Sequence, residues 1–168
     1  MTKESVYLDW LRDAHAMEKH AESLLKAAAS RLTDHPALQA RIEQYLEQSR
    51  DQQRQVKTLL RQYDSSWSVL KESLGRMSAV GQAASDMLQD EEGIRVAVSS
   101  YVFCNYKIAT YSTLLVAAEQ AEEGEDVRIV RRILQQESQM ASWLLQLLPQ
   151  AAEEAIVLRT EPELSGTD

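Results

Sequence analysis

The sequence SYVFCNYKIATY, residues 100–111, lies in the middle of a long segment with helical periodicity. Apolar residues in this segment recur at intervals of three and four, which places them on one face of an α-helix. The same face carries Cys104 and Lys107 at mid-length. Three other long segments have this periodicity, and each has a polar residue near its middle, namely Glu18, Ser49 and Glu137. The chemistry of this polar layer decides what kind of protein the chain is.

The composition favours a single helical domain. The chain has 168 residues, enough to bury a substantial core, and contains only 5 glycines and 3 prolines. Its formal net charge of -8 disfavours nucleic acid as a partner, since a surplus of cations is needed to neutralise phosphates. The single cysteine excludes an intrachain disulfide and fits a reducing compartment.

The N-terminal segment is charged and amphipathic, without the apolar core of a signal peptide. No stretch approaches the roughly 20 apolar residues that span a bilayer. We therefore expect a soluble cytoplasmic protein with no membrane or nucleic-acid partner.

The periodic segments predict an all-α protein with four long helices, spanning approximately residues 4–32, 36–63, 90–118 and 127–148. The first two are joined by a short turn, so they should be antiparallel neighbours. The second and third are joined by a long crossover that contains a short helix near residues 67–80. Such a crossover allows the second and third helices to run parallel, as in a ferritin-like bundle.

The C-terminal region is expected to be irregular. Pro149 should end or kink the fourth helix, because proline lacks the amide hydrogen that a helix interior requires. Residues 151–158 then predict a short separate helix, and the polar residues 159–168 a loose tail. The sequence thus indicates one four-helix-bundle domain, residues 1–158, followed by that tail.

The polar layer can be explained in two ways. Helices of similar length place their midpoints at similar height, roughly 20 Å from either end. Carboxylates at that depth cost several kcal/mol each unless they are paired, coordinated or protonated. Two metal ions bound by carboxylates would stabilise them. Alternatively, Lys107 would form an internal ion pair, with Tyr45 and Tyr101 as hydrogen-bond partners.

Several blocks of the sequence resemble the YciE/YciF-type ferritin-like family, the YciE branch in particular. They are DWLRDAHAMEK (9–19), AES (21–23), ARIEQ (40–44), YVF (101–103), QMA (139–141) and WL (143–144). The similarity extends from about Tyr7 to Pro149. It implies a ferritin-like bundle with a crossover, a homodimer, a link to bacterial stress responses and a carboxylate-bridged di-metal site.

The resemblance also implies that this metal site is degenerate. Glu18 and Glu137 match metal-binding carboxylates of the first and fourth helices. At five other positions where relatives tend to carry ligands or nearby acids, the chain has different residues, namely Tyr45, Gln48, Cys104, Lys107 and Gln136. Two divalent cations need roughly four carboxylates with nitrogen donors, so the remaining set is too small.

Two hypotheses follow. In the first, the di-metal centre is lost, Lys107 pairs with Glu18 and Glu137, and the protein is a non-enzymatic structural or interaction module. In the alternative, Glu18, Glu137 and either Cys104 or Glu22 bind one iron, manganese or zinc ion, with ferroxidase or peroxide chemistry. A thiolate ligand would suit zinc or iron better than manganese.

Overall fold

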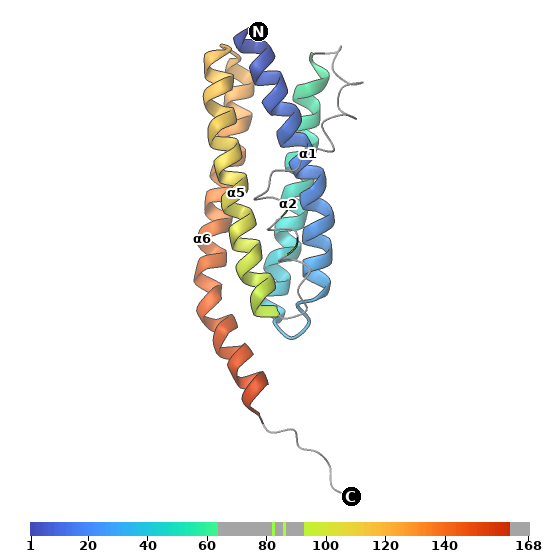
Figure 1. The fold of residues 1–168 in the computed structure, drawn as a ribbon, viewed down its shortest axis with the longest axis vertical. Helices are drawn as coiled ribbons and strands as arrows, with labels where there is room; N and C mark the ends of the chain where they lie inside the picture. Colours follow the sequence, from blue (N-terminus) through green and yellow to red (C-terminus); the bar gives the residue numbers. More distant parts are fainter. Residues whose placement is uncertain (64–81, 83–85, 87–92, 162–168) are drawn as a thin grey trace, which may run out of the picture.

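A computed structural model describes residues 1–63, 82, 86 and 93–161 of the chain. Within these residues the structure is helical, with α1 (Lys3–Ser30), α2 (Pro36–Arg61), α5 (Gly93–Gln120) and α6 (Gly124–Thr160). The four helices lie side by side in one elongated bundle (Figure 1). The predicted all-α four-helix bundle is confirmed. The short helix predicted near residues 67–80 lies outside the described residues.

The helices have the directions expected of a bundle with a crossover. Helix α1 packs antiparallel to α2 and also contacts α5, while α6 packs antiparallel to α5 and also contacts α2 (Figure 1). Tyr63, just after α2, donates a hydrogen bond to Asp126 in the first turn of α6, 3.0 Å away. Since α5 ends where α6 begins, the C-terminal ends of α2 and α5 lie together. The predicted parallel orientation of these two helices is therefore confirmed.

The core consists of two apolar clusters, one toward each end of the bundle. One is formed by residues such as Leu25, Ile42 and Phe103, and the other by residues such as Leu59 and Leu114. The mid-length polar residues of all four helices lie between them in each helix's sequence. The bundle thus places the polar layer between two apolar regions, where water cannot solvate it.

The fourth helix does not end at Pro149, so one of the two effects predicted for this proline is not observed. Helix α6 runs without interruption through Pro149 to Thr160, so the expected separate helix at residues 151–158 is its continuation. A proline leaves the carbonyl of the residue four before it without its helical partner. Here Leu145 and Pro149 are both exposed, so water can bind that carbonyl and the helix continues. Arg159 and Thr160 of the predicted tail belong to α6, and residues 162–168 lie outside the described part.

Polar contacts hold both ends of the bundle. At one end, buried Asp126 accepts hydrogen bonds from the hydroxyls of Tyr7 at 2.6 Å and Tyr63 at 3.0 Å, which joins α1, α2 and α6. At the other end, the buried His35 ring contacts Glu154 of α6 at 3.0 Å.

In the described ranges, no helix is sufficiently long and apolar to cross a bilayer.

Gly93 offers a test of the packing at the His35 end. A Cβ atom built at Gly93 would collide with the His35 imidazole, which Glu154 holds in place. We expect Gly93→Ala to destabilise the protein by about 1–3 kcal/mol through overpacking, measured by urea denaturation.

Gly124→Ala is the matched control, because nothing lies within 4 Å of the Cβ position at Gly124. That substitution should be neutral or stabilise by up to about 1 kcal/mol, as alanine is the better helix former. Equal effects of the two substitutions would contradict the tight contact at Gly93.

Candidate functional site

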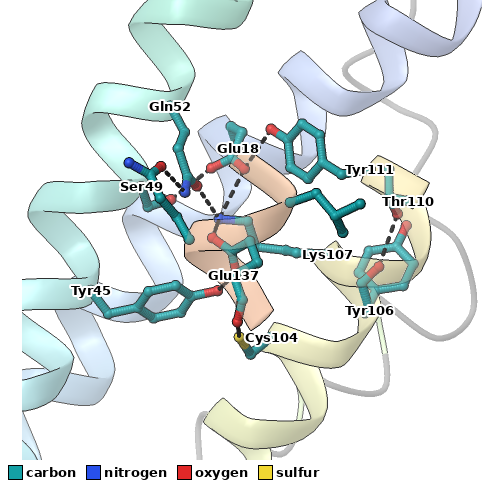
Figure 2. Close-up of polar contacts among 12 residues, drawn as sticks. Glu18, Tyr45, Ser49, Gln52, Cys104, Tyr106, Lys107, Thr110, Tyr111 and Glu137 are labelled. Atoms are coloured by element: carbon teal, nitrogen blue, oxygen red, sulfur yellow. Dashed lines mark hydrogen bonds and ion pairs between the residues drawn. The ribbon is translucent and has the colours of Figure 1, made fainter. Parts of the chain in front are cut away.

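A buried ammonium group is the centre of the polar layer. The Lys107 side chain, from α5, is completely buried. Its Nζ lies 2.9 Å from Glu18 Oε1, 2.8 Å from Glu137 Oε1 and 2.8 Å from Gln52 Oε1 (Figure 2). An ammonium group has three hydrogens, so each of them has an acceptor. The three acceptors come from α1, α6 and α2, and this single group therefore connects all four helices.

Both carboxylates accept further hydrogen bonds. Glu18 accepts from the Tyr111 hydroxyl at 2.8 Å and from Ser49 Oγ at 2.7 Å. Glu137 accepts from the Tyr45 hydroxyl at 2.6 Å and from Cys104 Sγ at 3.3 Å (Figure 2). Each carboxylate thus has Lys107 and two neutral donors around it. Such full satisfaction is what allows ionised groups to persist away from water.

The electrostatics favour a charged lysine. Desolvation opposes the charged form of Lys107, but the ion pairs with Glu137 and Glu18 outweigh it and raise its pKa. Desolvation raises the pKa of Glu18, and the negative charge of Glu137 acts in the same direction. Two ionised carboxylates and one ammonium group together carry one negative charge, which the neutral hydrogen-bond donors stabilise.

The neutral donors keep their protons. Burial first, and then the negative charge of Glu137, raises the pKa of Tyr45 and of Cys104. Burial and the Glu18 carboxylate raise the pKa of Tyr111 in the same way. Cys104 is therefore a thiol that donates a hydrogen bond, and it lacks the thiolate character that redox chemistry requires.

The residues present do not fit a di-metal cofactor. The Lys107 ammonium lies between the two carboxylates, and its charge would repel a divalent cation there. The four carboxylate oxygens already accept hydrogen bonds from five side chains. Glu22, the other carboxylate considered, pairs at the surface with Arg50 at 3.0 Å. Within residues 1–63, 82, 86 and 93–161, no three His, Cys, Asp or Glu side chains are grouped to hold a metal ion.

The structure brings together most of the residues that the sequence singled out. Glu18, Tyr45, Cys104, Lys107 and Glu137 are in one hydrogen-bonded network. Two others are placed differently: Gln136 joins it only through Gln52, 3.1 Å away, and Gln48 lies outside it with a buried, unpaired Nε2 atom.

One expected hydrogen-bond partner was wrong. Tyr101 is only partly buried and packs against the apolar core, while Tyr111 binds Glu18. The signal for Tyr111 was present in the sequence. It lies four residues after Lys107, one helical turn away on the same face, whereas Tyr101 lies six residues before it.

His15 is a second buried titratable group in α1. It is 3% exposed, and neither ring nitrogen has a hydrogen-bond partner in the described structure. Burial, followed by the positive charges of Lys19 and Lys57, lowers the pKa of His15 to about 4. His15 is therefore neutral and enclosed in the structure.

Comparison with known proteins identifies relatives of the whole bundle. The family model described as "Domain of unknown function (DUF892)" matches residues 2–157. A Xanthomonas campestris protein of known crystal structure is 31% identical, with a TM-score of 0.75, over 95% of this chain and 99% of that one. The Escherichia coli stress protein YciF is 21% identical, with a TM-score of 0.72, over 91% of this chain and 98% of that one. These matches confirm the predicted ferritin-like bundle and the YciE/YciF-type resemblance.

Removing the buried cation should strongly destabilise the bundle. In Lys107→Met, two carboxylates would remain buried without a cation, and we expect a loss of about 3–5 kcal/mol at pH 7 in urea denaturation. The loss should shrink as the pH is lowered toward the carboxylate range. Unpaired buried carboxylates have raised pKa values, so their protonation favours the folded state at low pH and this contribution is lost as pH rises.

Arg131→Met is the control for this experiment. Arg131 pairs with Glu119 at 3.1 Å, but both side chains are exposed, so its loss should cost less than about 1 kcal/mol. A triple variant, Lys107→Met with Glu18→Gln and Glu137→Gln, should recover part of the stability because it removes the buried charges. A Lys107→Met cost as small as that of Arg131→Met would contradict the central role of the ammonium group.

His15 should make stability pH-dependent. The folded-state pKa of His15 is about 4, below the 6.5 of the unfolded chain. The contribution of neutral His15 to the free energy of unfolding is therefore complete above pH 6.5 and is lost as the pH falls through about 4. The stability difference between wild type and His15→Gln should therefore change by up to about 3 kcal/mol between pH 7 and pH 4. His20→Gln, at an exposed position of the same helix, should leave the profile unchanged. Parallel profiles for wild type and His15→Gln would refute this assignment.

Proposed function

Because this chain belongs to the family described as "Domain of unknown function (DUF892)", we propose that it is a member whose polar layer holds an internal salt bridge in place of metal. In this proposal the protein acts as a structural or interaction module and not as an enzyme. The supporting observation is the position of Lys107 Nζ, 2.9 Å from Glu18 Oε1 and 2.8 Å from Glu137 Oε1.

The chemistry of the layer supports this role. A catalytic metal centre needs ligands with free lone pairs and an open coordination position for substrate. Here the two carboxylates are occupied by the ammonium and by hydroxyl and thiol donors. Burial raises the pKa of both tyrosines and of Cys104, so these groups keep their protons at neutral pH and serve as hydrogen-bond donors.

The biological setting is part of the same proposal. The similar Escherichia coli protein YciF is described as a stress protein, which supports a stress-associated role for this chain in a bacterium. A single, buried, free cysteine is compatible with the reducing cytoplasm. The net charge of -8 favours protein partners over nucleic acid.

Metal analysis tests the proposal directly. Chelator-treated wild-type protein, reloaded with iron, manganese or zinc and then dialysed, should retain far less than one ion per chain by elemental analysis. Cys104→Glu combined with Lys107→Glu should restore retention, because it replaces the ammonium with carboxylates beside Glu18 and Glu137.

The matched control is Gln44→Glu with Lys26→Glu, which makes the same change in net charge at exposed positions of α2 and α1. It should retain no more metal than wild type. Stoichiometric metal in the wild type that disappears in Glu18→Ala would overturn the proposal and favour the rearranged single-metal site.

A further inference from the structure

The C-terminal end of α6 extends beyond the rest of the bundle. Helix α6 has 37 residues, whereas its antiparallel neighbour α5 has 28. At 1.5 Å per residue the difference is about 14 Å. Figure 1 shows the end of α6 projecting past the turn that joins α1 and α2. Ala151 is the last buried residue of the helix, so residues 152–160 make no part of the buried core.

A pocket of about 450 Å³ lies where this extension passes the turn between α1 and α2. Pockets that receive ligands or partner side chains have volumes of roughly this size. The described residues that line it come from that turn and from α6: Asp34, Gln150, Glu153, Glu154, Val157 and Leu158. The α6 residues recur at intervals of three and four, so they share one face of the helix.

The pocket lining is divided into two bands along α6. Next to the turn, Asp34, Glu153 and Glu154 supply three carboxylates, and none of the six described lining residues is basic. One helical turn further out, Val157 and Leu158 are 49% and 54% exposed. We call these the negative band and the apolar band. The pocket thus joins a patch that attracts cations to a patch that is poorly solvated.

A buried histidine fixes the position of the negative band. The His35 ring is 4% exposed and contacts Glu154 at 3.0 Å. Gly93 closes the ring in, since a Cβ atom built there would lie 2.4 Å from it. Hydrogen bonding to His35, and then to Gln150, lowers the pKa of the Glu154 carboxyl, which is therefore ionised at neutral pH. The extension is held against the turn, so the pocket is already formed without a partner.

We propose that this pocket docks a basic amphipathic segment of a partner protein, whose lysine or arginine side chains contact the negative band while its apolar side chains contact the apolar band. The two bands lie one helical turn apart. A helical segment with basic and apolar side chains three or four residues apart has the matching spacing. The carboxylates steer the encounter, and burial of the apolar side chains retains the segment.

Charge complementarity favours this occupant over three others. Residues 162–168 of the chain carry Glu163 and Asp168 and no basic residue, so they would add negative charge to the negative band. A second copy has the same net charge of -8 and is repelled. A polyamine would leave Val157 and Leu158 in contact with water. A basic segment with apolar side chains complements both bands.

Fluorescence anisotropy with a labelled synthetic peptide tests the docking. The probe is an amphipathic peptide of leucine and lysine, about four helical turns long, with its leucines on one face. Two comparison peptides of equal length replace its lysines by glutamate or its leucines by serine. The full-length protein should bind the probe most tightly, the serine peptide more weakly and the glutamate peptide not at all.

Two double variants separate the two bands. Asp34→Asn with Glu153→Gln removes two carboxylates and leaves Glu154 in place. It should weaken binding of the probe about fivefold at low salt and reduce the salt dependence of binding. Val157→Ser with Leu158→Ser should weaken binding about tenfold and leave the salt dependence unchanged.

Each double variant has a matched control. Asp9→Asn with Glu43→Gln makes the same change in net charge at exposed positions of α1 and α2. Ile156→Ser removes a similarly exposed apolar side chain from the extension but not from the pocket lining. Both controls should bind the probe as the wild type does. Circular dichroism should show the same helix content in all of these proteins, because the substituted positions are not part of the buried core.

Four outcomes would overturn the docking site. They are equal affinity for the three peptides, equal affinity of the wild type and both pocket variants, and a loss in the controls as large as in the pocket variants. The fourth is self-association in light scattering that Val157→Ser with Leu158→Ser abolishes, which would assign the apolar band to a second copy.

The docking proposal rests on the interaction role proposed above but not on the state of the polar layer. Loss of peptide binding in a wild type that retains no metal would overturn the docking site alone. Metal retention together with intact peptide binding would overturn only the internal salt bridge in place of metal. Peptide affinity and metal content therefore report separately on the two proposals.

Discussion

The three hydrogen bonds of the Lys107 ammonium group are the constraint on which the rest of the bundle depends. Their acceptors, Glu18, Gln52 and Glu137, come from the three other helices. An apolar layer tolerates small shifts of one helix along another, because apolar contacts are non-directional. A buried charge does not, since a displaced partner leaves it unpaired at a cost of several kcal/mol. The layer thus specifies the register of all four helices at the height where the two apolar clusters meet.

An internal cation changes how such a bundle is stabilised. A bound metal couples stability to metal supply, because binding energy becomes folding energy. A lysine is part of the chain, so its charge is available whenever the protein folds. A lysine supplies less positive charge than two divalent ions would. The negative charge that it leaves on the two carboxylates is stabilised by neutral donors, namely Ser49, Tyr45, Tyr111 and Cys104. The side chains of this layer therefore act as one set, in which Cys104 takes part as a hydrogen-bond donor.

Helix α5 departs from the usual arrangement of a surface helix. A typical amphipathic helix buries an apolar side and exposes a charged one. Here the buried side carries Lys107, while the exposed side carries valine, alanine and serine without charge. The internal ion pair and this uncharged outer side thus lie on opposite sides of one helix.

The sequence by itself determined the four helices, their directions and the polar residues at mid-length, because helical periodicity and short or long connections are local properties. Glu18, Glu137, Lys107, Cys104 and Tyr45 could all be named from it. Only the tertiary structure decided that Tyr111 and not Tyr101 binds Glu18, that α6 continues through Pro149, and that Gln48 stays outside the network. It also showed His15 enclosed and Asp126 joining Tyr7 to Tyr63. Each of these depends on which side chains meet across helices, and spacing within one helix does not contain that information.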